Sequence, residues 1–256
     1  MRQFLFGAAL TALAIPGAAH AGETYIGVSA GLSLPGNSNN SGEFSSDVPA
    51  TPDFGTIPAG TDLGWKTDFD NGLAISGQVG HAFDNGLRVE LEVAYSKYDV
   101  DAHSSLTVGG ANIDGVDVAV LTRGTPDPAN PTVGAVIADG QGDVSNFGAF
   151  LNVLYDINTG SSFTPYVGAG IGYQGVDIDY QPSGVPVGKG DDDGFAWQAI
   201  VGASFAVSDR VDVFGQYNYR ASFKRSKIEL SLLPATLGVQ SKQSIVSAGV
   251  RYRFGS

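Results

Sequence analysis

The amino-acid sequence predicts an all-β fold, an eight-stranded antiparallel up-and-down transmembrane β-barrel with short periplasmic turns and long extracellular loops. Three observations support this prediction. Apolar and polar residues alternate with a period of two in segment after segment, which is typical of strands with two different faces. The connections between these segments are alternately long and short along the chain. After residue 21 there is no run of about 18 apolar residues, so no transmembrane helix is expected.

The first 21 residues have the features of a secretory signal peptide. A positive start at Arg2 precedes an apolar stretch over 4–14, and Ala19 and Ala21 flank His20 as a small-residue cleavage site. We therefore expect residues 1–21 to be removed and residues 22–256 to form one outer-membrane β-barrel domain.

Composition excludes several classes of function. The chain has no cysteine, which excludes disulfides and zinc sites built on cysteine. Its formal net charge of −12 argues against nucleic acid as a partner, because little here would neutralise phosphates. No cofactor and no catalytic or metal-ligating residues are expected.

Eight segments carry the alternation that predicts strands. The clearest is Phe163–Tyr173, where Val167, Ala169 and Ile171 alternate with glycines. Its apolar face suits lipid, and its glycine face suits a narrow interior. The predicted strands cover residues 24–34, 66–83, 87–100, 143–156, 163–173, 195–207, 211–228 and 242–254.

The connections predict the topology. Short turns are expected at 84–86, where Asn-Gly is a strong hairpin signal, and at 157–162 and 208–210. Long loops, rich in Gly, Ser, Asn, Pro and Asp, are expected at 35–64, 101–142, 181–194 and around 230–238. Within the second loop, the apolar patches 116–121 and 133–137 are expected to extend strands or form a small hairpin. This layout puts both chain ends on the short-turn side and all long loops on the other side, as in outer-membrane barrels.

Charged residues recur on the face opposite the apolar one, which excludes a soluble barrel with an apolar interior. We expect them to form an ion-pair network that fills a narrow lumen, since small eight-stranded barrels are usually filled by side chains. A gated path for ions or small solutes is the alternative. The expected lumen network is Arg88, Glu90, Glu92, Arg220, Arg251 and Arg253.

Outward aromatic residues should gather at the two membrane boundaries. The girdle beside the short turns and the C-terminus is expected to hold Phe83, Tyr155, Phe163, Phe205 and Phe254. The girdle toward the long loops is expected to hold Phe147, Tyr173, Trp197 and Tyr219.

Two motifs carry a family resemblance. The segments 165–173, Pro-Tyr-Val-Gly-Ala-Gly-Ile-Gly-Tyr, and 249–254, Gly-Val-Arg-Tyr-Arg-Phe, resemble the small outer-membrane β-barrel superfamily of Gram-negative bacteria. This superfamily includes the OmpA barrel domain, the opacity adhesins and related porin-family proteins. The resemblance implies a place in the outer membrane beside lipid and lipopolysaccharide, and it implies that Phe254 serves as the signal read by the barrel assembly machinery.

Two further constellations suggest chemistry. His103-x-Ser105 is similar to the His-x-Ser of outer-membrane lipid A deacylases, but no third partner can be placed and a loop histidine is the favoured interpretation. The run 191–193 is Asp-Asp-Asp and, with Asp177 and Asp179, could offer oxygen ligands to calcium. The spacing is not that of an EF-hand, so a solvated acidic loop is the favoured interpretation.

The expected function is a non-enzymatic surface or structural role. The loops 35–64 and 101–142 are the expected contact region for a surface ligand, because the strands fix them at the cell surface. A pore and, behind it, a lipid A-modifying enzyme are the alternatives.

Overall fold

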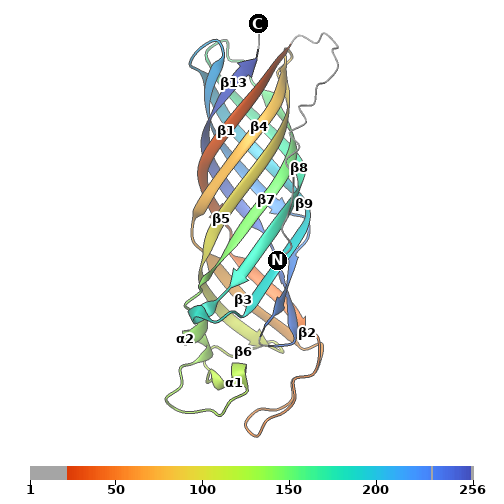
Figure 1. The fold of residues 1–256 in the computed structure, drawn as a ribbon, viewed down its shortest axis with the longest axis vertical. Helices are drawn as coiled ribbons and strands as arrows, with labels where there is room; N and C mark the ends of the chain where they lie inside the picture. Colours follow the sequence, from red (N-terminus) through yellow and green to blue (C-terminus); the bar gives the residue numbers. More distant parts are fainter. Residues whose placement is uncertain (1–21, 232, 255–256) are drawn as a thin grey trace.

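The computed structural model describes residues 22–231 and 233–254, so the predicted signal peptide, 1–21, lies outside the described residues. Thirteen antiparallel strands form one sheet, which winds into a tall barrel (Figure 1). The strands are β1 (Gly22–Pro35), β2 (Ser38–Phe44), β3 (Asp62–Phe69), β4 (Gly72–Phe83), β5 (Leu87–Val108), β6 (Ala111–Asn112), β7 (Gly142–Asp156), β8 (Phe163–Tyr180), β9 (Gly188–Ala206), β10 (Val211–Ser222), β11 (Ser226–Leu230), β12 (Ala235–Val239) and β13 (Lys242–Phe254).

The sheet closes on itself around the end of the barrel that carries the short turns, which we call the turn end. From β1 the pairing passes through β4, β5, β7, β8, β9, β10 and β13, and β13 pairs back with β1. Closure gives every one of these strands a hydrogen-bonding neighbour on both sides, so the ring has no free edge.

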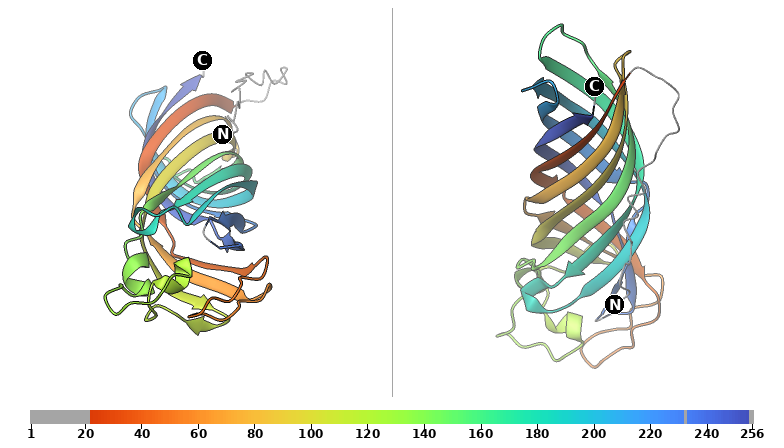
Figure 2. Two further views of the ribbon diagram at one scale, coloured as in Figure 1. Left: turned by 60° about the horizontal axis from the view of Figure 1, so that its bottom comes forward. Right: turned by 45° about the horizontal axis from the view of Figure 1, so that its top comes forward.

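The ring continues toward the opposite end of the barrel, which we call the loop end. At this end β3, β2, β12 and β11 take the places that β4, β1, β13 and β10 hold at the turn end. There β5 pairs with β3, and the pairing passes through β2, β12 and β11 to β9. Short non-strand segments at 36–37, 70–71, 223–225 and 240–241 separate β1 from β2, β3 from β4, β10 from β11, and β12 from β13. The sheet therefore has more strands than the eight predicted (Figure 2). Two of the predicted strands, 66–83 and 211–228, are each interrupted, and β2, β6 and β12 form in segments predicted as loops.

The prediction of four long unstructured loops is wrong in part. β2 and β12 lie inside the segments predicted as loops, and β3, β5, β9 and β11 extend into them. The patches at 116–121 and 133–137 do not extend strands, although an isolated antiparallel bridge joins Asp117 and Thr132 between them. They lie largely in the short helices α1 (Ala119–Thr122) and α2 (Val133–Ile137). Thr132 caps α2 by accepting a hydrogen bond from the backbone N–H of Ala135, and Val133 and Ile137 face the core four residues apart. A single 3₁₀ turn, η1 (Pro182–Gly184), precedes β9. Among the described residues, no helix is long and apolar enough to cross a membrane.

The polarity of the barrel inverts between its two ends. Toward the turn end, aliphatic side chains such as Val28, Leu151 and Val201 point outward and are about half exposed, while the inward positions are polar. Toward the loop end, the outward positions carry charges and the interior holds an apolar cluster. That cluster comprises Phe44, Val48, Leu63, Trp65, Tyr98, Val100, Leu106, Val133, Ile137, Val144, Val176, Ile178, Tyr180, Ile228, Ala235, Leu237 and Val239.

The inversion occurs at one level of the wall. Along the inner face of β5 the buried residues change from Ser96 to Tyr98, and along β7 they change from Asn146 to Val144. Outside, Lys97 and Asp143 form an ion pair of 3.2 Å at the same height. On both faces the side chains therefore change character at this level: the inner face from polar to apolar, and the outer face from apolar to charged.

Glycine on the inner face of β8 reflects close packing at the turn end. A Cβ added at Gly170 would collide with the side-chain oxygen of Asn152 across the strand pair. The adjacent Ala169 points outward and is exposed. Ala169 and Gly170 are therefore adjacent residues on opposite faces of β8.

We expect Gly170→Leu to prevent or slow folding of the barrel, because the new side chain has no space in the filled interior. Ala169→Leu, the matched control, should be tolerated because it adds an apolar group to the outer face. Heat-modifiable migration on a gel after refolding into lipid measures both. Equal folding yields for the two variants would contradict this assignment of faces.

Candidate functional site: a filled lumen and a loop-end cavity

An ion pair lies at the centre of the turn-end interior. The Arg220 guanidinium donates to Glu92 Oε1 at 2.9 Å, and both side chains are 3 % exposed. Gln198 and Asn152 donate their amide groups to Glu92 Oε2 at 2.6 and 3.0 Å. Gln198 Oε1 in turn accepts from Arg220 Nε at 3.1 Å and from an Arg220 terminal nitrogen at 2.8 Å. Every Glu92 oxygen is therefore bonded, which is the condition under which a buried charge pair is tolerated.

A second set of polar contacts lies nearer the turn end. Glu90 accepts from the Tyr25 hydroxyl at 2.7 Å and from the Asn152 amide at 3.1 Å. Arg88 pairs with Asp156 at 3.4 Å and lies over the Tyr166 ring, 4.5 Å from its centroid. Asn152 contacts both Glu90 and Glu92, so it joins the two sets.

The last two predicted lumen residues lie toward the open turn end. Arg251 is buried, stacks over the Tyr25 ring at 4.7 Å and is 3.9 Å from Asp212. Arg253 is partly exposed and bridges Asp212 and Glu23, each at 3.1 Å. Arg253 is therefore a rim residue, whereas the other five predicted lumen residues are buried.

Little space remains between these side chains. A cavity lined by Glu92, Arg220, Asn218 and the wall of β1 and β4 measures about 10 Å³, which is about the space needed for one water molecule. We call the buried residues Arg88, Glu90, Glu92, Asn152, Gln198, Arg220 and Arg251 the polar plug.

The predicted girdle residues lie on the outer face. Phe163 faces Phe205 across β8 and β9, Trp197 packs against Tyr219 at 5.5 Å, and Phe254 ends β13 opposite Thr24. Phe83 and Tyr219 are half-buried, and the other seven are exposed. The prediction omitted further exposed aromatics on the same face, namely Phe195, Tyr217, Phe223 and Tyr252.

The acidic run 191–193 is part of β9 and not of a loop. Successive strand residues point to opposite faces, so Asp191 and Asp193 are exposed whereas Asp192 is half-buried and accepts from the Lys227 backbone N–H at 3.2 Å. Asp177 faces Asp191 across the strand pair. The three consecutive carboxylates therefore do not converge on a common point.

His103 lies inside the barrel and not on a loop. β5 has two bulges: its register against β3 shifts near Asp101, before His103, and again near Ser105, after it, where the φ is 58°. Each extra residue reverses the inside and outside alternation, so His103 and then Leu106 point inward. His103 Nδ1 is 2.8 Å from the Thr67 hydroxyl, while the Ser105 backbone N–H donates to Asp114. Within the described part of the chain, His103 and Ser105 share no hydrogen bond.

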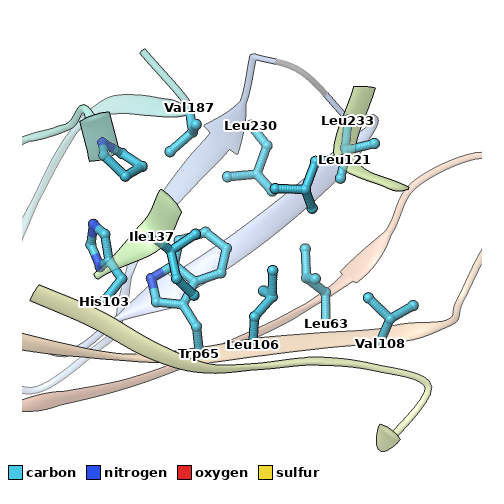
Figure 3. Close-up of a pocket in the computed structure, with 11 residues that line it drawn as sticks. Leu63, Trp65, His103, Leu106, Val108, Leu121, Ile137, Val187, Leu230 and Leu233 are labelled. Atoms are coloured by element: carbon cyan, nitrogen blue, oxygen red, sulfur yellow. The ribbon is translucent and has the colours of Figure 1, made fainter. Parts of the chain in front are cut away.

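A cavity of about 80 Å³ lies next to His103 in the loop-end interior. Strands β3 and β5 form one wall, and α1, α2, η1 and the chain around β11 cover it (Figure 3). Sequence reasoning missed this cavity because its residues come from segments assigned to loops. The lining residues are Leu63, Trp65, His103, Leu106, Val108, Leu121, Ile137, Pro182, Val187, Leu230 and Leu233.

Comparison with known proteins identifies the relatives of this barrel. A family model described as "Surface antigen" matches residues 56–255. The chain belongs to this surface antigen family. It is 28 % identical over 193 residues to an outer membrane protein of Gluconacetobacter diazotrophicus, covering 72 % of this chain and 42 % of that protein. It is 34 % identical over 76 residues to the outer membrane protein PagN of Salmonella typhimurium, covering 27 % of this chain and 31 % of PagN. The chain thus spans less than half the length of each curated relative.

One solved structure with a similar fold agrees with the barrel described above. The outer membrane protein OprG of Pseudomonas aeruginosa has a TM-score of 0.60 at 15 % identity, covering 93 % of this chain and 98 % of OprG. Together with the family match, this places the surface antigen barrel in the outer membrane of Gram-negative bacteria. The predicted family resemblance and location are confirmed.

We expect Glu92→Gln to destabilise the barrel by about 3 to 5 kcal/mol, because it leaves the buried Arg220 without a counter-charge. Glu23→Gln is the matched control: it removes a carboxylate whose partner Arg253 is partly exposed, and should cost at most about 1 kcal/mol. Urea unfolding in lipid measures both variants. A loss at Glu92 no larger than that at Glu23 would show that the central pair adds nothing.

Burial lowers the pKa of His103 to about 4. The ring is therefore neutral at pH 7 and stays neutral in the folded protein until the pH approaches 4. An unfolded histidine takes up its proton near pH 6.5, so acidification below about 6.5 should destabilise the loop end, by about 3 kcal/mol in all once pH 4 is reached. Histidine NMR titration and hydrogen exchange between pH 7 and 4 measure the two effects. An apparent pKa of 6 or more would contradict the buried position.

Proposed function

We propose that this surface antigen barrel is a non-enzymatic contact protein of the cell surface. In this proposal the turn-end section is an eight-stranded transmembrane barrel with its short turns in the periplasm, and the loop end stands outside the cell. The observation that carries the proposal is the inversion of polarity at the level of the Lys97–Asp143 pair. Apolar outward residues suit lipid below this level, and charged outward residues suit water above it.

Exposed segments at the loop end are the proposed contact surface. Residues 45–60 and 124–131 are mostly exposed and lie beyond the strands. Arg123 joins the two loops: its guanidinium donates to the carbonyl oxygens of Pro49 and Gly55 at 2.9 and 2.8 Å and lies over the Phe54 ring. A contact surface held in one shape loses less conformational entropy on binding than free loops would.

The polar plug favours this role over a pore. Each charge of the central pair has several partners, and the adjacent cavity has room for about one water molecule. The position of His103 supports a non-enzymatic role in the same way, because its Nδ1 faces Thr67 and the Ser105 segment is held by Asp114. A general base must be within reach of its nucleophile.

The proposed partners follow from the outer face. The girdles and aliphatic residues would contact outer-membrane lipid and lipopolysaccharide. Phe254, exposed at the end of β13, is the proposed signal for the barrel assembly machinery. A surface ligand would bind the loop end.

Removal of the first exposed loop tests the contact role. Glu43 and Asp62 face each other in the β2–β3 pair, so an Asn-Gly turn can replace residues 45–60 and still close the hairpin. We expect cells displaying this variant to adhere to epithelial cells no better than cells lacking the protein, while heat-modifiable migration is unchanged. A variant with 45–60 scrambled but Val48 and Ile57 retained controls for loss of packing, and it should also lose adhesion. Wild-type adhesion by both variants would refute the contact role.

Two measurements test the alternatives. Planar bilayers containing the protein should show the conductance of bare bilayer, and discrete conductance steps would favour a pore. Lipid A from cells expressing wild type and His103→Ala should have the same mass spectrum. A modification present only with wild type would favour an enzyme.

A further inference from the structure

Four basic residues gather on one side of the barrel where β10 and β13 reach the loop end. Lys224 and Arg225 follow β10, Lys227 lies in β11, and Lys242 begins β13 opposite Ala221 of β10. In the part of the chain that the structure describes, none of the four takes part in a salt bridge. A chain with a formal net charge of −12 thus carries a positive surface here, which we call the basic patch.

The other side of the ring has the opposite charge at the loop end. Two lysines that lie near these carboxylates are paired with them: Lys97 with Asp143 and Lys189 with Asp179, each at 3.2 Å. The exposed or half-exposed carboxylates of β5, β7 and β8 are Asp99, Asp101, Asp143, Asp177 and Asp179. The basic patch is therefore a local feature that the overall charge of the chain does not explain.

Arg225 is exposed and yet held in one position. Its Nη1 donates to the carbonyl oxygen of Asn39 at 3.0 Å, to the Ser41 hydroxyl at 3.1 Å and to the carbonyl oxygen of Gly238 at 3.4 Å. The side chain crosses Gly238 so closely that a Cβ there would be 3.3 Å from Arg225 Cδ. All three bonds come from Nη1, so the rest of the guanidinium can bind a group outside the protein. Fixing an arginine in advance reduces the entropy lost on binding.

The patch begins where the aromatic girdle ends. Phe223, 62 % exposed, directly precedes Lys224, and Trp197 packs against Tyr219 on the strands below. Aromatic rings in such a girdle lie at the level of the lipid headgroups. The stem of Lys242 lies over Gly36, which is typical of a lysine that extends its ammonium group toward the headgroups.

We propose that the basic patch binds the phosphate groups of an outer-leaflet glycolipid, lipid A. Arg225 binds phosphate through the free side of its planar fork, and the lysines act as point charges. The acyl chains lie along the apolar wall below, where Tyr217 and Val246 face each other and are both exposed. This inference rests on the proposed orientation, with the loop end outside the cell, and it names the lipid contact that the proposal left general.

Native mass spectrometry of the mature chain, 22–256, in detergent tests the site. The probes are bisphosphorylated lipid A and the same lipid with both phosphates removed. We expect the phosphate-free lipid to bind about tenfold or more weakly, because the charge-assisted contacts are lost. Inorganic phosphate in large excess should not displace lipid A, since it has no acyl chains to occupy the apolar wall.

Paired variants locate the binding. Lys224→Gln combined with Lys242→Gln should weaken lipid A binding about tenfold or more. Among the described residues neither side chain makes a hydrogen bond or an ion pair, so the fold should be kept, as heat-modifiable migration will show. Lys97→Gln combined with Lys189→Gln removes the same charge from the other side of the barrel and should leave binding unchanged, because both lysines are already paired.

Three results would overturn the proposal: equal binding of the two lipids, equal losses in the two double variants, or displacement of lipid A by inorganic phosphate. The contact role is decided separately, because both variants of loop 45–60 keep all four cations of the basic patch. Adhesion that depends on this loop, together with lipid A binding that is indifferent to the patch, would overturn this inference alone.

Discussion

Closure of the strand ring is the constraint on which the rest of this structure depends. In lipid an unpaired backbone N–H or C=O has no partner, so each strand must have a neighbour on both sides. The pairing from β1 around to β13 and back to β1 meets that requirement. A ring of this size encloses only a narrow interior, so the side chains that point inward must fill it and satisfy one another.

The polar plug is the consequence of that narrow interior. Polar inward positions opposite an apolar outer face also specify which face of each strand points outward, because a strand that is alike on both faces sets its register only weakly. Glu92, Arg220 and Gln198 solve the problem by bonding to one another at 2.6 to 3.1 Å. The cost of burying this central charge pair is offset by hydrogen bonds to both Glu92 oxygens, and the same packing leaves little space for solute.

The loop end follows the opposite rule, which the proposed arrangement explains because its surroundings there are water. The same ring continues there with an apolar interior built around Trp65, Tyr180 and Leu237. This cluster converts what would have been free loops into a folded extension of the barrel, joined at its tip by Arg123. A rigid outer section can present both a fixed contact surface and an internal cavity, which disordered loops could not.

Alternation in the chain was sufficient to predict the turn end. Period two assigns Val167 and Ile171 to the outside and Glu90 and Glu92 to the inside, because neighbouring strand residues always face opposite ways. Aromatic residues at both ends of these strands were predictable for the same reason. The loop end was not predictable. Its apolar residues, such as Phe44, Leu63 and Trp65, are scattered among Gly, Ser and Asn and show no regular alternation, and the residues that they pack against are distant in sequence. The position of His103 depends on the bulge near Asp101, because a single extra residue in a strand reverses every face that follows it. Local pattern thus describes the turn end, whereas non-local pairing creates the cavity at the loop end.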